Sequence, residues 1–224
     1  MFRISRTLRQ ARAALRAPVL LLAGCALAVS LQAWEAERVM EVAQQRGPRV
    51  QQLALQLRNM IDKATPLEIN AKLALVNGFF NSRVSYAEDQ DVWGQIDYWA
   101  SPLETLEKGR GDCEDYAIAK YFSLLAAGVP GEQLRMVYVR AQFQGRSVAH
   151  MVLAHYASAE AEPSILDNLQ TEVKPASARR DLQPVFSFNA EGLWSGVGST
   201  SAGNPVARLS QWRDLLAKAR AEGF

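Results

Sequence analysis

Apolar residues recur at helical spacing in the part of the chain that follows residue 34. Between residues 49 and 64 they return every three or four positions, which predicts an amphipathic helix with one buried face. The preceding residues, 35–46, are interpreted as a helical or frayed lead-in. The apolar positions of the predicted helix are Val50, Leu53, Leu57, Met60 and Ile61.

Two short motifs predict where further helices begin. Residues 65–68 (Thr-Pro-Leu-Glu) and 101–104 (Ser-Pro-Leu-Glu) both have the order of a capping box, with proline at the first helical position. The second motif predicts a short helix that ends near Gly109. The first predicts a helix with one apolar face, made of Ile69, Leu73, Val76 and Phe80.

The spacing of the apolar residues changes after residue 130. A last long helix is predicted from Asp112 to Gly128, and two strands follow at residues 134–143 and 147–156, where Val, Tyr and Met are frequent. Gln144-Gly145 between them is a plausible turn. Because helices come first and strands follow, we predict an α+β protein with an antiparallel sheet.

The C-terminal part continues this pattern. We predict a third strand at residues 164–168 and a fourth at residues 185–193. Leu209, Trp212 and Leu216 predict a closing amphipathic helix. Four tryptophans could form a partner pocket, but core packing is the better prediction for each of them; they are Trp93, Trp99, Trp194 and Trp212.

The most informative segment is residues 109–116, Gly-Arg-Gly-Asp-Cys-Glu-Asp-Tyr. Asp112 suits an N-cap, which places Cys113 in the first turn of the long helix, where the positive end of the helix favours a thiolate. Backbone N–H groups there could hold an oxyanion; Gln95 and Trp99 are side-chain candidates for the same task. The alternative is a buried structural cysteine, against which the glycines and carboxylates argue.

A cysteine nucleophile needs a base and a group that orients it. The chain has only two histidines, His150 and His155, which lie five residues apart on one predicted strand and so face opposite sides of the sheet. At most one of them can face Cys113. Asp167 on the next predicted strand could pair beside His150, and the three residues then form a workable triad.

At this point the sequence resembles a known family. Residues 111–116, 149–153 and 166–168 are similar to those of the bacterial transglutaminase-like cysteine proteinases, and within them to the LapG-type periplasmic proteases. The likeness extends from about residue 65 to residue 167, and more loosely to the C-terminus. It implies a papain/transglutaminase-like core with Cys113 as nucleophile, His150 as base and acid, and Asp167 as the orienting group.

The resemblance also implies a calcium site formed partly by Asp112, Glu114 and Asp115. The residues themselves also favour a bound cation. Three carboxylates beside the cysteine raise the pKa of its thiol, and a helix N-terminus offsets only about 0.3–1 kcal/mol per charge. A bound divalent cation removes this conflict, and oxygen-only ligands favour calcium. Backbone carbonyls, water or another acid could complete the site; the candidate acids are Asp89, Asp91 and Asp97.

A simpler interpretation of these acids needs no metal. Asp112 would cap the helix, while Glu114 and Asp115 would favour its positive end, as acids in first turns commonly do.

The resemblance implies a biological setting as well. Such proteases cut a large surface adhesin near its N-terminus, at a di-alanine-containing site, and so release biofilm cells. An inner-membrane receptor that binds cyclic di-GMP on its cytoplasmic side sequesters them. Two other functions remain open: a transglutaminase-like acyltransferase, and a non-catalytic envelope binding domain or lipoprotein.

The first 33 residues are predicted to be a signal peptide or an N-terminal anchor. Five arginines precede an uncharged, mostly apolar run at residues 17–33, and a cut near Ala33 would place residues 34–224, a single domain, in the periplasm. A lipid-modified Cys25 or an uncleaved anchor is the alternative. Without the five arginines the formal charge falls from +2 to −3, and no basic stripe remains, so we expect no nucleic-acid binding.

Overall fold

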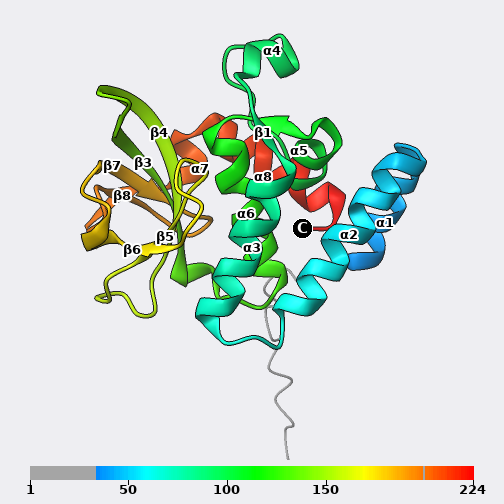
Figure 1. Ribbon diagram of the computed structural model, residues 1–224, viewed down its shortest axis with the longest axis horizontal. Coiled ribbons are helices and arrows are strands. Elements are labelled where there is room, and N and C mark those ends of the chain that lie inside the picture. Colours follow the sequence, from blue (N-terminus) through cyan, green and yellow to red (C-terminus); the bar gives the residue numbers. More distant parts are fainter. Residues whose placement is uncertain (1–33, 199) are drawn as a thin grey trace, which may run out of the picture. The chain divides into compact units, whose positions relative to one another are not determined.

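The computed structural model describes residues 34–198 and 200–224. The predicted signal segment at residues 1–33, with Cys25, lies outside the described residues. Helices dominate the first half of the described range and strands the second half (Figure 1). The helices are α1 (Ala36–Gln45), α2 (Pro48–Ala64), α3 (Ile69–Arg83), α4 (Asp89–Trp93), α5 (Pro102–Lys108), α6 (Cys113–Ala126), α7 (Pro205–Arg208) and α8 (Ser210–Glu222).

Seven strands form one antiparallel sheet in the order β6-β5-β4-β3-β7-β8-β9. They are β3 (Leu134–Phe143), β4 (Arg146–His155), β5 (Ser164–Leu166), β6 (Lys174–Pro175), β7 (Leu182–Phe188), β8 (Leu193–Ser195) and β9 (Ser201–Gly203). The α+β class with an antiparallel sheet is thus confirmed. Two further strands, β1 (Ser85–Tyr86) and β2 (Arg110–Gly111), pair in parallel beside the start of α6.

Helix α6 joins the helical layer to the sheet. It packs on β4 on one side and on α3 on the other, and in Figure 1 it lies between the strands and the α1–α2 pair. Its middle is buried all round, from Asp115 to Leu124. The core around it includes Trp212 of α8, which is fully buried among the rings of Tyr121, Phe122 and Phe188.

Local signals predicted several element boundaries correctly. The box at residues 101–104 is formed: Ser101 Oγ accepts from the Glu104 N–H at 3.2 Å, and Glu104 Oε2 accepts from the Ser101 N–H at 2.9 Å. The predicted hairpin is confirmed too, with Gln144-Gly145 as its two-residue turn.

The capping box predicted at residues 65–68 was wrong. Thr65 is the C-cap of α2, and its hydroxyl donates to the Ile61 carbonyl at 2.9 Å. Helix α3 starts three residues later than the motif indicated, at Ile69, with no side-chain cap. The hydroxyl is therefore used to end one helix and not to begin the next.

The fourth strand predicted at residues 185–193 was also wrong in its extent. Strand β7 ends at Phe188, and a turn held by Asn189 leads into β8 at Leu193. The Asn189 Oδ1 accepts from the N–H groups of Glu191 at 2.8 Å and Gly192 at 3.0 Å, which reverses the chain.

Lys120 of α6 places a charge in the centre of this core. Its side chain has no exposed area, and its Nζ has no hydrogen-bond partner among the residues that the structure describes. Burial lowers the pKa of Lys120 to about 7, which the charge of Asp167 opposes only in part. The unfolded chain keeps this proton up to about pH 10.5, so the free energy of unfolding rises with pH between about 7 and 10.5.

Replacing Lys120 by methionine should therefore stabilise the protein. We expect the free energy of unfolding at pH 7 to rise by about 1–3 kcal/mol, the usual cost of an unsatisfied buried polar group. Its increase between pH 7 and 10.5 should flatten. Thermal denaturation at several pH values measures both, with Lys63→Met on the exposed face of α2 as the control. Lys120 Nζ lies 5.5 Å from the centre of the Tyr116 ring, and a destabilised Lys120→Met protein would mean that this contact outweighs the cost of burying the charge.

No helix among the described residues combines the length and the apolar character needed to cross a membrane.

Candidate active site

The loop before α6 is shaped to present Cys113. Gly109 ends α5 in the left-handed conformation, with a φ of 63°. Gly111 has no room for a side chain, because a Cβ there would collide with the carboxylate of Asp115. Strand β2, which contains Gly111, pairs with β1 and fixes the segment just before the cysteine. Cys113 is the first residue of α6, as the sequence predicts.

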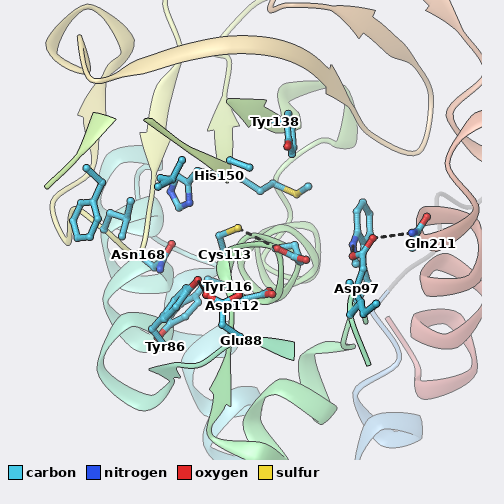
Figure 2. A pocket seen from close by; sticks show the side chains of 18 of the residues that line it. Tyr86, Glu88, Asp97, Asp112, Cys113, Tyr116, Tyr138, His150, Asn168 and Gln211 are labelled. Carbon is cyan, nitrogen blue, oxygen red and sulfur yellow. Dashed lines mark hydrogen bonds between the residues drawn. The ribbon is translucent and has the colours of Figure 1, made fainter. Parts of the chain in front are cut away.

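The thiol of Cys113 lies among acids. Its Sγ is 3.1 Å from Oε2 of Glu114 (Figure 2). Burial raises the pKa of the Cys113 thiol well above its ordinary value, and the charges of Glu114 and Asp112 raise it further. The backbone N–H of Met151 in β4 lowers the pKa of the thiol but does not reverse the shift. The carboxylates thus oppose the thiolate, as expected from the sequence.

His150 and Asp167 form a buried pair. Nε2 of His150 is 2.7 Å from Oδ1 of Asp167, and both side chains are almost completely buried. Since Nε2 is occupied by the carboxylate, Nδ1 is the ring nitrogen left for the thiol. Asp167 lies just after β5 and not within it, because β5 ends at Leu166.

Arg179 completes this pair. Its Nη2 donates to Oδ2 of Asp167 at 2.6 Å and to Asp181 at 2.7 Å. Although burial opposes it, the contacts with His150, the Leu169 N–H and Arg179 lower the pKa of Asp167 to about 2. The carboxylate is therefore ionised at any physiological pH.

Two asparagines of α3 hold the loop that carries Asp167. Asn81 Nδ2 donates to the carbonyl of Asp167 at 2.8 Å, and Asn77 Nδ2 donates to the carbonyl of Thr171 at 2.8 Å. Because the two asparagines are one helical turn apart, they hold both ends of the loop. Sequence reasoning did not find Arg179, Asn77 or Asn81, since nothing in their local sequence marks them.

The two histidines lie on opposite faces of the sheet, as predicted. His150 shares its face with Val152 and Ala154, the face turned away from the main helical core. It still lines the cleft that contains Cys113, and Figure 2 shows both side chains at this cleft. His155 is buried elsewhere, with its Nε2 3.3 Å from Oε1 of Gln133.

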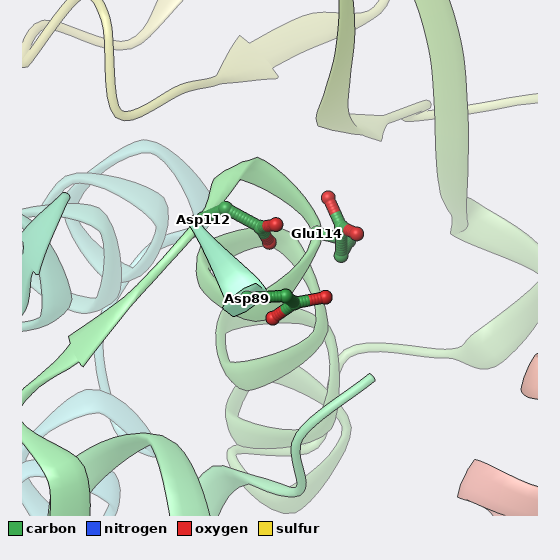
Figure 3. A group of neighbouring side chains, drawn as sticks. All are labelled: Asp89, Asp112 and Glu114. Carbon is green, nitrogen blue, oxygen red and sulfur yellow. The ribbon is translucent and has the colours of Figure 1, made fainter. Parts of the chain in front are cut away.

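A group of carboxylates lies next to the cysteine. Ligand atoms of Asp89, Asp112 and Glu114 all lie within 4.8 Å of one another, and Figure 3 shows their carboxylates turned toward one another. Asp89, one of the three further acids considered from the sequence, thus joins Asp112 and Glu114. Asp115 is not in this group; its Oδ1 accepts from the Ala100 N–H at 2.9 Å.

The pKa values of these acids lie above their ordinary range. Burial, followed by the charge of Glu114, raises the pKa of Asp112 to about 10. Burial also raises the pKa of Asp89 to about 6 and that of Asp115 well above its ordinary value. Asp89 Oδ1, Asp112 Oδ1 and Asp115 Oδ2 are buried without a hydrogen-bond partner among the described residues. Buried, unpaired, oxygen-only donors are what a hard divalent cation such as Ca²⁺ requires, so the residues fit one.

The other candidates from the sequence lie at or beyond the edge of the site. Asp97 and Trp99 line the cleft, but Trp99 Nε1 donates to Oδ1 of Asp97 at 2.9 Å and is therefore already occupied. Asp91 and Gln95 are exposed and do not line the cleft.

The cleft itself has a volume of about 830 Å³. Cys113 and His150 both line it, together with several acids and several apolar side chains. The apolar lining includes Ile96, which is 94% exposed, and also Tyr86, Tyr138, Phe143, Val148 and Phe186. A cleft of this size and composition can hold several residues of a polypeptide.

The fold and this cleft define a cysteine protease of the transglutaminase-like class. The family model described as bacterial transglutaminase-like cysteine proteinase matches residues 52–181, more than half of the chain. The chain therefore belongs to the bacterial transglutaminase-like cysteine proteinases.

Solved structures of LapG from Legionella pneumophila are similar over most of both chains. The EGTA-treated form is 39% identical, with a TM-score of 0.74, and the match covers 84% of this chain and 99% of that one. The calcium-bound form is 40% identical, with a TM-score of 0.70 and a coverage of 82% and 98%. No curated protein sequence matches the chain.

Proposed function

We propose that this protein is a calcium-dependent periplasmic endopeptidase, with Cys113 as nucleophile, His150 as base and acid, and Asp167 as the orienting carboxylate. One observation carries the proposal: a cysteine at a helix start shares a cleft with His150, whose Nε2 is held by the buried carboxylate of Asp167.

The residues divide the reaction into two steps. His150 takes the proton of Cys113, and the thiolate attacks the carbonyl carbon of the substrate peptide bond. The leaving amine takes that proton from the imidazolium, and an acyl-thioester remains on Cys113. Water, deprotonated by His150, then releases the acid and restores the thiol. Asp167, held ionised by Arg179, keeps the imidazole oriented and stabilises it while it is charged.

We propose that Asp89, Asp112 and Glu114 hold a calcium ion, and that Asp115 supports the same loop or adds a ligand. When bound, the ion neutralises the acids that raise the pKa of Cys113. Asp115 packs against Gly111, so its carboxylate fixes the backbone that leads into the cysteine. The relative from Legionella pneumophila, which has been solved in a calcium-bound form, supports this assignment.

Removing calcium should stop cleavage. Excess EGTA is expected to abolish activity and added calcium to restore it, because the thiol pKa stays high without the ion. Asp89→Asn and Asp115→Ala should weaken calcium binding, measured by calorimetry, together with activity. Asp91→Asn is the matched control, since Asp91 lies in the same helix α4 but outside the group. Full activity in EGTA, with no calcium bound to the purified protein, would contradict the calcium site.

We propose that the substrate is a large surface adhesin, cut near its N-terminus at a di-alanine-containing site so that biofilm cells are released. An inner-membrane receptor loaded with cyclic di-GMP would sequester the protease; the nucleotide belongs to that partner. The family resemblance supports both partners. Incubating the purified protein with candidate adhesin N-terminal regions, and identifying the fragments by mass spectrometry, tests the substrate. Intact adhesin after prolonged incubation with calcium would contradict it.

We expect the protein exported from cells to begin near Trp34, without the arginine-rich segment. Intact-mass measurement on the exported protein decides this. A diacylglyceryl group on Cys25 would instead establish a lipoprotein, and a mass that includes residues 1–33 would establish an uncleaved anchor.

A further inference from the structure

Strand β4 is only partly paired. It pairs with β3 along its whole length, from Arg146 to His155. On its other side it pairs with β5 only through Leu153, Ala154 and His155. Among the described residues no strand pairs with this side of β4 at residues 146–152, and residues 146–149 are exposed.

The hairpin fixes which backbone groups point to that unpaired side. Gln144 and Gly145 have φ of 49° and 75°, as in a two-residue type I′ turn, so Phe143 and Arg146 are a hydrogen-bonded pair. Such pairs alternate along an antiparallel ladder. The hydrogen bond from the Tyr156 N–H to the Gln133 carbonyl, 2.8 Å, lies at the position that this alternation requires. The N–H and C=O groups of Ser147, Ala149 and Met151 therefore point away from β3.

The unpaired edge leads to the thiol. Met151, whose N–H points outward, lines the same cleft as Cys113, and this N–H lowers the pKa of the thiol. Val148, Ala149, His150 and Met151 all line the cleft that contains the cysteine. Ser147 and Ala149 thus offer a row of backbone donors and acceptors that ends at the nucleophile.

We propose that the substrate binds as an added β-strand along β4, its backbone paired with Ser147 and Ala149 and its scissile peptide bond at Cys113. An exposed strand edge is a template for an extended chain, and main-chain pairing gives affinity that depends little on sequence. Alternate side chains of the substrate would then face the apolar lining of the cleft. Only an extended, unfolded segment of the substrate can bind in this way, so folded domains are left uncut. The inference rests on the proposed endopeptidase function.

A backbone scan of the substrate tests this pairing. The probe is a peptide that spans the mapped adhesin cut site, in which each peptide N–H within four residues of the cut is replaced in turn by an ester oxygen. Each loss of a paired N–H should lower kcat/KM about three- to tenfold. The losses should fall at every second position on one side of the cut, with changes below about twofold between them. Losses without this alternation, or none above twofold, would overturn the proposal. If the parent peptide is not cleaved at all, the endopeptidase function fails, and the pairing with it.

A variant of the enzyme gives a second measurement. Ser147→Pro removes an outward N–H that the ladder to β3 does not use, so it is compatible with an edge strand. We expect kcat/KM to be about three- to tenfold lower than that of Ser147→Ala, which keeps the N–H, mainly through KM. Equal rates for the two variants would contradict pairing at Ser147. If Ser147→Pro does not fold, the ester series on the unchanged enzyme decides.

Discussion

Cys113→Ala is expected to abolish cleavage while the protein keeps its fold. Alanine is well suited to the first turn of α6, and the cysteine is only partly buried, so little packing is lost. Without the sulfur no thioester can form, and the His150–Asp167 pair alone cannot attack a peptide bond. Cleavage of the adhesin segment, followed by mass spectrometry, should show no fragments above background.

Circular dichroism and thermal denaturation of the same sample are the control, because an unfolded variant would be inactive for another reason. A folded Cys113→Ala protein that still cuts would rule out Cys113 as the nucleophile. Labelling with a thiol reagent at neutral pH gives a second readout. The labelling should be fast, should depend on His150, and should slow in EGTA.

His150→Ala is expected to lower kcat by several orders of magnitude, the usual loss when a triad base is removed. Its imidazole is the only one in the cleft among the described residues, and its Nε2 is held by Asp167. Binding of substrate should change much less, so the loss should appear in kcat and not in KM.

His155→Ala is the matched control on the same strand. That side chain is buried beside Gln133 on the other face of the sheet, so its loss should lower the melting temperature without a comparable loss of kcat. If the two effects were exchanged, His155 would be the base, and the assignment of His150 would have to be abandoned.

Much of the fold follows from signals that act over a few residues. The hairpin of β3 and β4 was predictable because a two-residue turn separates two apolar segments with the same period. The boundary within residues 185–193 was missed, although Asn189 and Gly192 are residues typical of a turn. Strands as short as β6 and β9 have no period of their own; they are strands only because a neighbour pairs with them.

The residues of the candidate site also differ in how far the sequence could predict them. Cys113 was predictable because its setting is local: two glycines, a capping position and a helix start. Asp89 is separated from Asp112 by 23 residues, and the pairing of β1 with β2 brings the two segments together. Arg179 reaches Asp167 from a loop beyond β6. Contacts of this kind depend on the finished tertiary structure.

The separate origins of the nucleophile and its base have a practical consequence. Cys113 comes from a helix, whereas His150 and Asp167 come from the sheet and the loop behind it. A compact intermediate with native helices and strands, but with the two layers displaced by an ångström or two, would keep its far-ultraviolet circular dichroism spectrum. It would lose activity, because His150 could no longer take the proton of Cys113. Catalytic rate in mild denaturant is therefore a more sensitive gauge of layer docking than any spectroscopic measure of secondary structure.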